Sequence, residues 1–366
     1  MTQSERPPLV LHVFPTFAVG GAQVLFAALA NHFGAAFRHI VVSLDGNLAC
    51  RERLDRSLDV TFPAVEAPKD SMLANVLRFR RLLRTWRPDV MVTCNWGAIE
   101  WAMANRPAVA RHVHTEHGFG PEERDAQIRR RGLTRRLVLR HSTVVLPSRN
   151  LWRIATDMWA LRPENVHYVP NGIDLERFAP RQHTVARDVP VIGTVAALRK
   201  EKNLGRLLRA FASLGAPARL IVVGDGAERA ELEALARSLD VADRASFVGH
   251  VDDPSPSYAE FDVFALSSDT EQMPLAVIEA MAAGLPVAAT DVGDVRAMLA
   301  EQNASFVGKL YDSDLARSLT ELLADPSLRA RVGRANREKA VREFDQSSMF
   351  QAYEAVWRGL PLPVAR

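Results

Sequence analysis

The stretch Glu271-Gln272-Met273-Pro274-Leu275-Ala276-Val277-Ile278-Glu279 places two carboxylates eight residues apart, where an apolar run gives way to a helical pattern. The run at residues 262–266 predicts a strand, and Pro274 is typical of a first helical position, where its missing N–H is not needed. Gly284 and Pro286 predict the end of the helix. A helix that starts just after a strand presents unpaired backbone N–H groups, which bind phosphate well. The stretch therefore predicts an α/β fold in which two carboxylates flank a phosphate-binding helix start.

Outward from this stretch, short apolar runs alternate with helical patterns along the whole chain. This alternation predicts parallel sheets that are covered by helices on both faces and bind ligands beyond the carboxyl ends of their strands. The predicted strands cover residues 9–14, 39–44, 60–63, 89–93, 111–115, 143–147, 166–169, 191–195, 218–223, 245–248, 262–266, 287–290 and 305–307. So many strands exceed one small sheet, and the predicted fold class is α/β with two doubly wound Rossmann-like domains.

The length of 366 residues also predicts two domains. Asn171-Gly172 is a turn signal, and residues 181–190 are polar without apolar periodicity, as expected of a linker. The predicted parts are an N-terminal domain at residues 1–180, a C-terminal domain at 181–345 and a C-terminal helix at 346–366.

The composition is that of a soluble globular protein, with 48% hydrophobic and 24% charged residues. Cys50 and Cys94 are too few for a disulfide framework or a metal cluster, and they fit a reducing cytoplasm. The first apolar run, at residues 9–13, predicts a buried strand and not a signal peptide. No apolar segment approaches the roughly 18 residues of a membrane span. We therefore expect a cytoplasmic protein.

The net charge of +3 hides an asymmetry along the chain. Residues 1–180 carry 24 basic and 17 acidic residues, whereas the remainder carries 22 and 26. The segment from Arg124 to Arg140 contains seven arginines interleaved with apolar residues. This pattern predicts a basic amphipathic helix on an anionic membrane surface, peripheral to the inner face of the cell membrane, or else a solvated helix face. No nucleic-acid motif is present, and the acidic second half makes a nucleic-acid partner unexpected.

Two segments of the first half carry candidate chemistry. Gly20-Gly21 precedes a helical pattern, where glycines let backbone approach a ligand, although a tight turn explains them equally well. His114-Thr115-Glu116-His117-Gly118 sets two histidines around a carboxylate. The segment leaves a strand without a third ligand nearby, so we expect no metal and no other cofactor.

In the second half, Arg199, Lys200 and Lys202 precede a helical pattern and offer positive charge to a diphosphate, unless they form an ordinary basic loop. Gly224-Asp225-Gly226 follows a predicted strand and supplies half of a dinucleotide-binding fingerprint.

Together these segments resemble the family 4 retaining glycosyltransferases, in particular the exopolysaccharide-biosynthesis type with a His-x-Glu-His-Gly segment followed by an arginine-rich helix. The Glu271 to Glu279 spacing resembles the E-x7-E signature of the family. Other matching segments follow in the family's order: Gly20-Gly21, His117-Gly118, Val169-Pro170-Asn171-Gly172, Lys202-Asn203, Gly224-x-Gly226 and Thr290-Asp291-Val292-Gly293. The resemblance implies a GT-B fold, in which the two domains face a central cleft and the C-terminal helix crosses back to the first domain.

The resemblance also implies an activity, namely metal-independent transfer of a sugar from a UDP- or GDP-sugar to a hydroxyl of a saccharide or lipid-linked saccharide, with retention of configuration. The implied catalytic residues are His117, Glu271, Lys202 and Arg199. The implied donor-binding residues are Gly20, Gly21, Gly224, Gly249, His250, Met273, Pro274, Leu275 and Glu279. The implied acceptor-side residues are Asn95, Trp96 and His114.

The chain departs from the family pattern at three points. Gln272 and Met273 replace a Gly-Phe pair, Ala197 stands where the family has an arginine, and Gln23 replaces a glutamate. These departures keep a non-catalytic subunit that binds nucleotide sugars open as an alternative. A nucleotide-sugar epimerase of related fold is a second alternative, although it explains the two glutamates poorly.

Overall fold

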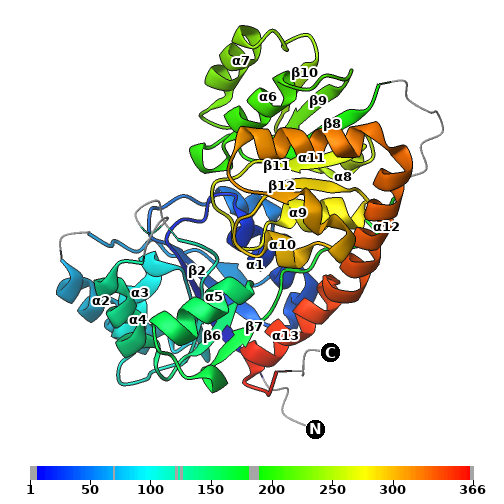
Figure 1. Ribbon diagram of the computed structural model, residues 1–366. Coiled ribbons are helices and arrows are strands. Elements are labelled where there is room, and N and C mark those ends of the chain that lie inside the picture. Colours follow the sequence, from blue (N-terminus) through cyan, green and yellow to red (C-terminus); the bar gives the residue numbers. More distant parts are fainter. Residues whose placement is uncertain (1–5, 69–70, 120–122, 124–126, 181–188, 363–366) are drawn as a thin grey trace. The chain divides into compact units, whose positions relative to one another are not determined.

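The computed structural model describes residues 6–68, 71–119, 123, 127–180 and 189–362. The chain divides into two compact units, and each is built around its own sheet (Figure 1). The first unit comprises Met1–Val169 and Met349–Arg366, and the second comprises Pro170–Ser348.

The boundary between the units lies after Val169, eleven residues before the end of the first domain that we expected at residue 180. Ile173, Leu175 and Phe178 explain this difference, because their buried side chains belong to a core cluster of the second unit. The expected linker at residues 181–190 lies largely outside the described residues, since residues 181–188 are among those left out.

Seven parallel strands form the sheet of the first unit, in the order β3-β2-β1-β4-β5-β6-β7. They are β1 (Leu9–Phe14), β2 (Arg38–Ser43), β3 (Val60–Thr61), β4 (Val90–Cys94), β5 (Arg111–Thr115), β6 (Thr143–Leu146) and β7 (Val166–Tyr168). The direction of the strand order reverses between β1 and β4. In a doubly wound sheet, the carboxyl ends of the strands at such a point are where ligands bind.

Helices cover both faces of this sheet (Figure 1). They are α1 (Gly21–Phe33), α2 (Met72–Trp86), α3 (Ile99–Ala104), α4 (Arg129–Leu139), α5 (Arg149–Arg153) and α13 (Gln346–Arg358). On one face, Leu29 of α1 and Trp357 of α13 share a core cluster with Val10 of β1. On the other face, Phe79 of α2 stacks on Trp101 of α3 at a centroid distance of 4.4 Å.

Six parallel strands form the sheet of the second unit, in the order β10-β9-β8-β11-β12-β13. They are β8 (Val191–Val195), β9 (Arg219–Val223), β10 (Ala245–Gly249), β11 (Val263–Leu266), β12 (Val287–Thr290) and β13 (Val307–Gly308). Here the strand order reverses between β8 and β11. The loops that follow these two strands therefore meet at the expected ligand-binding edge.

The helices of the second unit also lie on both faces of its sheet (Figure 1). They are α6 (Leu204–Ala212), α7 (Arg229–Ser238), α8 (Ser255–Tyr258), α9 (Leu275–Ala282), α10 (Val295–Met298), α11 (Asp312–Ala324) and α12 (Pro326–Glu343). One core cluster joins α9 and α10 to the sheet through residues such as Val277 and Val295. A second cluster joins α6 and α11 to the opposite face through residues such as Leu207 and Leu319.

All thirteen predicted strands are present, and their ends differ from the predictions by at most two residues. One local prediction is wrong: Pro274 has extended backbone (φ −69°, ψ 122°) and lies just before α9 instead of in its first turn. Cys50 and Cys94 are buried free thiols. Among the described residues, no helix is long and apolar enough to cross a bilayer.

Candidate functional site

The loops after β8 and β11 bring Lys202 and Glu271 into direct contact. The Lys202 Nζ lies 2.6 Å from Glu271 Oε1, and the Ser268 hydroxyl donates to the same oxygen over 2.7 Å. The Glu271 side chain is 10% exposed and that of Lys202 is 25% exposed, so both are sheltered yet reachable. A cation and a carboxylate thus share the carboxyl edge of the sheet at the point where its strand order reverses.

Buried polar contacts hold Lys202 in place. The next residue, Asn203, has a left-handed backbone (φ 42°) and caps α6 by accepting a hydrogen bond from the Arg206 N–H. The buried Arg206 in turn forms an ion pair of 2.8 Å with Asp269, in the loop that carries Glu271. Ion pairs therefore join the two loops, and the Lys202 ammonium is positioned before any ligand arrives.

The segment after β12 supports the backbone around Glu271. Gly293 has a positive φ of 54°, and a Cβ at this position would lie only 2.3 Å from the Glu271 carbonyl oxygen. The Asp294 N–H donates to the Gln272 carbonyl over 2.9 Å, and the Thr290 hydroxyl donates to the Ser268 carbonyl over 2.6 Å. Only glycine fits at position 293, which explains the match with the family's segment there.

Met273 and Pro274 are buried, and their side chains face the protein. The Asn171 side chain donates to the Met273 carbonyl over 3.0 Å, so the residues just before α9 are fixed from the start of the second unit. Any contact of Met273 with a ligand must therefore come from its backbone. Leu275 is half-buried at the first position of α9.

Glu279 lies in α9 and is held by a residue from another helix. Its Oε2 accepts a hydrogen bond of 2.6 Å from the hydroxyl of Tyr258, which is 1% exposed. Burial raises the pKa of the Glu279 carboxyl above its ordinary value, whereas the Tyr258 hydrogen bond and the charge of Arg177 lower it. Sequence reasoning missed Tyr258, which carries no motif and stands 21 residues before its partner.

The remaining predicted residues of the second unit lie at the same edge of its sheet, after β8, β9 and β10. Gly224 (φ 127°) packs so closely on the preceding loop that a Cβ would lie 2.0 Å from the Ala196 carbonyl oxygen. Its N–H donates to the Gly249 carbonyl over 2.8 Å. His250 is exposed beside Asp252, and Arg199 is also exposed. The close packing on Ala196 explains why a glycine stands at position 224 without any contact to a ligand. The exposed side chain of Arg199 can reach solvent or substrate.

The first unit gathers its candidates at the carboxyl ends of β4 and β5. Asn95 (φ 58°) accepts a hydrogen bond of 2.8 Å from the His117 N–H. Burial, with a smaller contribution from His114, lowers the pKa of His117 to about 4. His117 is therefore neutral near pH 7 and able both to donate and to accept a hydrogen bond. Gly20 and Gly21 follow β1 at this edge, and nothing lies within 4 Å of where a Cβ of Gly21 would be.

His114 does not reach the surface. It is fully buried, shares a 2.8 Å hydrogen bond with the Thr93 hydroxyl and lies 3.6 Å from the Glu116 carboxylate. The expected direct contact of His114 with an acceptor therefore does not fit the structure, because its ring is enclosed beneath the surface.

The arginine-rich segment is only partly a surface helix, which corrects our expectation for residues 124–140. Arg135 is fully buried and forms ion pairs with the carboxylates of Glu116 (3.3 Å) and Glu123 (3.2 Å). Its guanidinium also lies 4.9 Å from the ring of Trp96 and 4.6 Å from that of Trp159. The helical spacing of arginines cannot distinguish this buried position from its exposed neighbours. Residues 124–126 of the segment lie outside the described residues.

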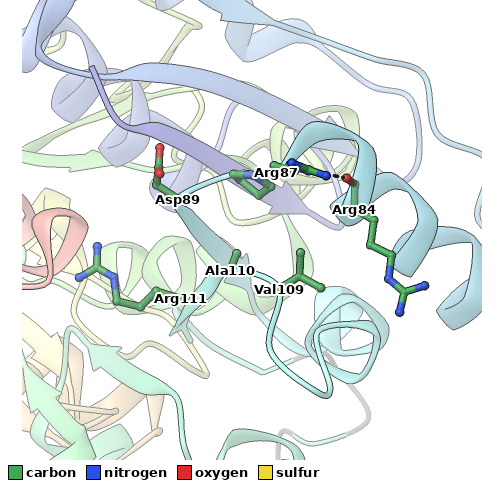
Figure 2. Close-up of a pocket in the computed structure, with 7 residues that line it drawn as sticks. Arg84, Arg87, Asp89, Val109, Ala110 and Arg111 are labelled. Atoms are coloured by element: carbon green, nitrogen blue, oxygen red, sulfur yellow. Dashed lines mark hydrogen bonds between the residues drawn. The ribbon is translucent and has the colours of Figure 1, made fainter. Parts of the chain in front are cut away.

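The described residues bring no three His, Cys, Asp or Glu side chains together in a way that could hold a metal ion. One cavity of about 580 Å³ opens in the first unit at the amino ends of β4 and β5, the sheet edge opposite to the candidate residues. Figure 2 shows that the guanidinium groups of Arg84 and Arg111, which line this cavity, point away from each other. Its cations therefore do not converge on one ligand.

Two family models match the chain, and together they reach from residue 19 to residue 339. The model described as Glycosyltransferase Family 4 matches residues 19–177, and that described as Glycosyl transferases group 1 matches residues 176–339. Two curated relatives illustrate the similarity. The lipopolysaccharide core biosynthesis glycosyltransferase LpsE of Rhizobium meliloti is 31% identical over 45% of this chain. The N-acetyl-alpha-D-glucosaminyl L-malate synthase of Bacillus anthracis is 26% identical over 48% of it. The chain spans about half the length of these relatives, at 49% and 47%.

Solved structures share the whole fold. HepE of Anabaena, solved in complex with UDP-glucose, matches with a TM-score of 0.80 at 18% identity, over 96% of this chain and 100% of its own. WaaG, a glycosyltransferase involved in lipopolysaccharide biosynthesis, matches with a TM-score of 0.72 at 19% identity over the same shares. With both family models matched in sequence order and both sheets of the fold present, the chain belongs to the family 4 glycosyltransferases and has the GT-B fold.

Proposed function

We propose that this protein transfers a sugar from a nucleotide-diphosphate donor, a UDP- or GDP-sugar, to an acceptor hydroxyl with retention of the anomeric configuration. The observation that carries the proposal is the pairing of Lys202 with Glu271 beside the start of α9. A cation and free helix N–H groups suit a diphosphate, and carboxylates suit sugar hydroxyls. Names of similar proteins, including the UDP-glucose complex of HepE, support a nucleotide sugar as donor.

The residues of this site have distinct roles in the proposed reaction. Lys202 neutralises the diphosphate as it leaves, which stabilises the transition state more than the bound donor. Glu271 accepts hydrogen bonds from hydroxyls of the transferred sugar, and Glu279 accepts them from the ribose. Arg199 takes the place of the family arginine that is missing at Ala197. No metal ion is needed, because the protein's own positive groups carry the charge.

Retention follows from attack of the acceptor on the same face of the sugar from which the diphosphate departs. In this proposal the leaving phosphate oxygen accepts the proton of the acceptor hydroxyl, so no nucleophile from the protein is required. On the acceptor side, the neutral ring of His117 hydrogen-bonds a sugar hydroxyl, and Asn95 holds its backbone. Trp96 contributes an apolar surface nearby.

We further propose that the acceptor is a lipid-linked saccharide, met at the cytoplasmic face of a membrane through the first unit. Leu133 and Leu137 of α4 are 57% and 58% exposed on a helix that also exposes Arg129, Arg136 and Arg140. Leu73 and Leu77 of α2 are exposed in the same way, at 73% and 54%. Both helices pack against α3. Apolar side chains among arginines suit an anionic lipid surface.

Release of free nucleoside diphosphate tests the proposal. Purified protein is incubated with UDP-glucose or GDP-mannose, with and without a lipid extract that supplies acceptors. A glycosyltransferase releases nucleoside diphosphate faster when the extract is present, and Lys202→Ala abolishes the increase. A non-catalytic subunit binds donor without release, and an epimerase changes the sugar without release, so either of these outcomes overturns the proposal.

A further inference from the structure

The Tyr258 hydroxyl is directed at Glu279 and is rigidly held. The 2.6 Å bond to Glu279 Oε2 is accompanied by a longer contact of 3.2 Å with the Ala276 carbonyl. The Tyr258 ring packs against Phe178, Phe261 and Phe264 at centroid distances of 5.6 to 5.8 Å. An aromatic cluster of this kind leaves the hydroxyl little freedom, so it fixes the orientation of the carboxylate that it bonds.

Two other charged groups act on Glu279. Arg177, from the chain segment before β8, and Asp253, from the loop before α8, pair with each other over 2.9 Å. The charge of Arg177 favours the ionised carboxylate, whereas that of Asp253 opposes it, so their effects partly cancel. Both side chains are about half exposed, which screens them further. The short hydrogen bond from Tyr258 is therefore the strongest local interaction that keeps Glu279 ionised against its burial.

We propose that Tyr258 is a positioning residue for donor binding: it commits one carboxylate oxygen of Glu279 and presents the other, ionised, to a hydroxyl pair of the nucleotide. This inference rests on the proposed function, in which Glu279 receives the ribose. The inference makes a specific statement about the protonation state of Glu279. An ionised carboxylate accepts two strong hydrogen bonds, whereas a protonated one loses an acceptor and binds a pair of hydroxyls less well.

Tyr258→Phe removes only the hydroxyl and keeps the ring among its aromatic neighbours. Burial then acts on Glu279 without this opposing hydrogen bond, so the pKa of the carboxyl rises further. Affinity for a nucleotide sugar should fall at neutral pH and fall more at acidic pH, because a larger fraction of Glu279 is protonated. Where the pH lies about one unit below the raised pKa, only about a tenth of the Glu279 carboxyl is ionised, which predicts a loss of affinity of about tenfold.

Calorimetric titration of the full chain with UDP-glucose and with GDP-mannose, between about pH 5 and pH 8, tests the inference. These diphosphate diesters do not titrate in this range, so the pH profile reports on the protein. Four proteins are compared: wild type, Tyr258→Phe, Glu279→Gln and the double variant. Tyr353→Phe, another buried tyrosine, located in the first unit, is the matched control.

If Tyr258 acts through Glu279, its substitution lowers affinity in the wild-type background and has no further effect in the Glu279→Gln background. The acid limb of the affinity profile also moves to higher pH in Tyr258→Phe and is absent in Glu279→Gln. Equal losses in both backgrounds, or an unshifted acid limb, would show a merely structural role and overturn the inference.

Failure of the proposed function gives a different result, in which the wild-type protein binds neither nucleotide sugar. The inference is still tested in that case by carbon NMR of glutamate-labelled protein without nucleotide sugar. The carboxyl resonance that disappears in Glu279→Gln should titrate at higher pH in Tyr258→Phe than in wild type. An unchanged titration would overturn the role of Tyr258 whatever the protein binds.

Discussion

Lys202 and Arg199 are the residues on which the proposed chemistry depends most directly. Because charge on the diphosphate grows as it leaves, Lys202→Ala should lower kcat by about a hundredfold or more and change donor KM less. If Arg199 replaces the arginine missing at Ala197, Arg199→Ala should reduce kcat to a similar extent. Steady-state kinetics with each variant provide the measurement, and Arg237→Ala, which removes an exposed cation of α7, is the control.

Normal turnover of Arg199→Ala would show that Arg199 does not perform the role of the family arginine that is missing at Ala197. Ala197→Arg would then be expected to raise kcat, since it restores the cation at the family position. Loss of binding without loss of turnover in Lys202→Ala would instead contradict the role of Lys202 in leaving-group stabilisation.

At the scale of a single element, α4 combines a buried charge with an exposed basic face. Arg135→Met should lower the free energy of unfolding by about 3–5 kcal/mol, because the buried Glu116 would lose its guanidinium and the buried Glu123 would keep only Arg131 as an ion-pair partner. Arg136→Met, one residue along the same helix and exposed, should change it by less than about 0.5 kcal/mol. Urea unfolding followed by circular dichroism measures both, and equal effects would show that the buried pairs do not stabilise the fold.

The exposed face of α4 makes a separate prediction about membranes. Arg129, Arg130, Arg136 and Arg140 changed together to Gln should reduce cosedimentation with anionic vesicles, since each exposed arginine contributes about 1 kcal/mol of attraction. Binding of the wild-type protein should fall as salt rises, and turnover on a soluble acceptor mimic should survive the four changes. Equal binding to neutral and anionic vesicles, or none to either, would identify α4 as a solvated helix.

The whole first unit should lose stability in mild acid. Burial lowers the pKa of His39 to about 4 and that of His12 well below its ordinary value, and the two rings share a hydrogen bond of 3.2 Å. In the unfolded chain these histidines bind protons below about pH 6.5, whereas in the folded protein the His39 ring stays neutral down to about pH 4. The free energy of unfolding should therefore fall with pH across this window, by about 1.4 kcal/mol per unit for each histidine.

Chemical unfolding at several pH values measures this slope. His39→Asn should make the slope shallower between about pH 4 and pH 6.5, whereas His250→Gln, at an exposed histidine, should leave it unchanged. The same slope in His39→Asn as in the wild-type protein would assign the acid sensitivity to other groups.

At the scale of the whole molecule, sequence patterns predict the thirteen strands, since parallel strands buried on both faces are continuous apolar runs with turn signals between them. The resemblance to the family assigns both Lys202 and Glu271 to the catalytic residues, and the structure places their side chains 2.6 Å apart. Sequence patterns do not predict Tyr258 beside Glu279 or Arg135 between two glutamates. These contacts join distant residues through helix packing, which leaves no periodic trace in the sequence.

The most direct test of the central claim, that a nucleotide sugar is held by the carboxylates at either end of the Glu271 to Glu279 stretch, is its binding affinity measured by calorimetry. A thermal-shift screen of nucleotide sugars first selects the one that stabilises the wild-type protein most. Glu279→Ala should then weaken binding by about tenfold to a hundredfold, because the ribose loses hydrogen bonds to a charged acceptor. Glu231→Ala, at an exposed glutamate of the same unit, should leave affinity unchanged. Equal affinity of the wild-type and Glu279→Ala proteins would contradict the claim.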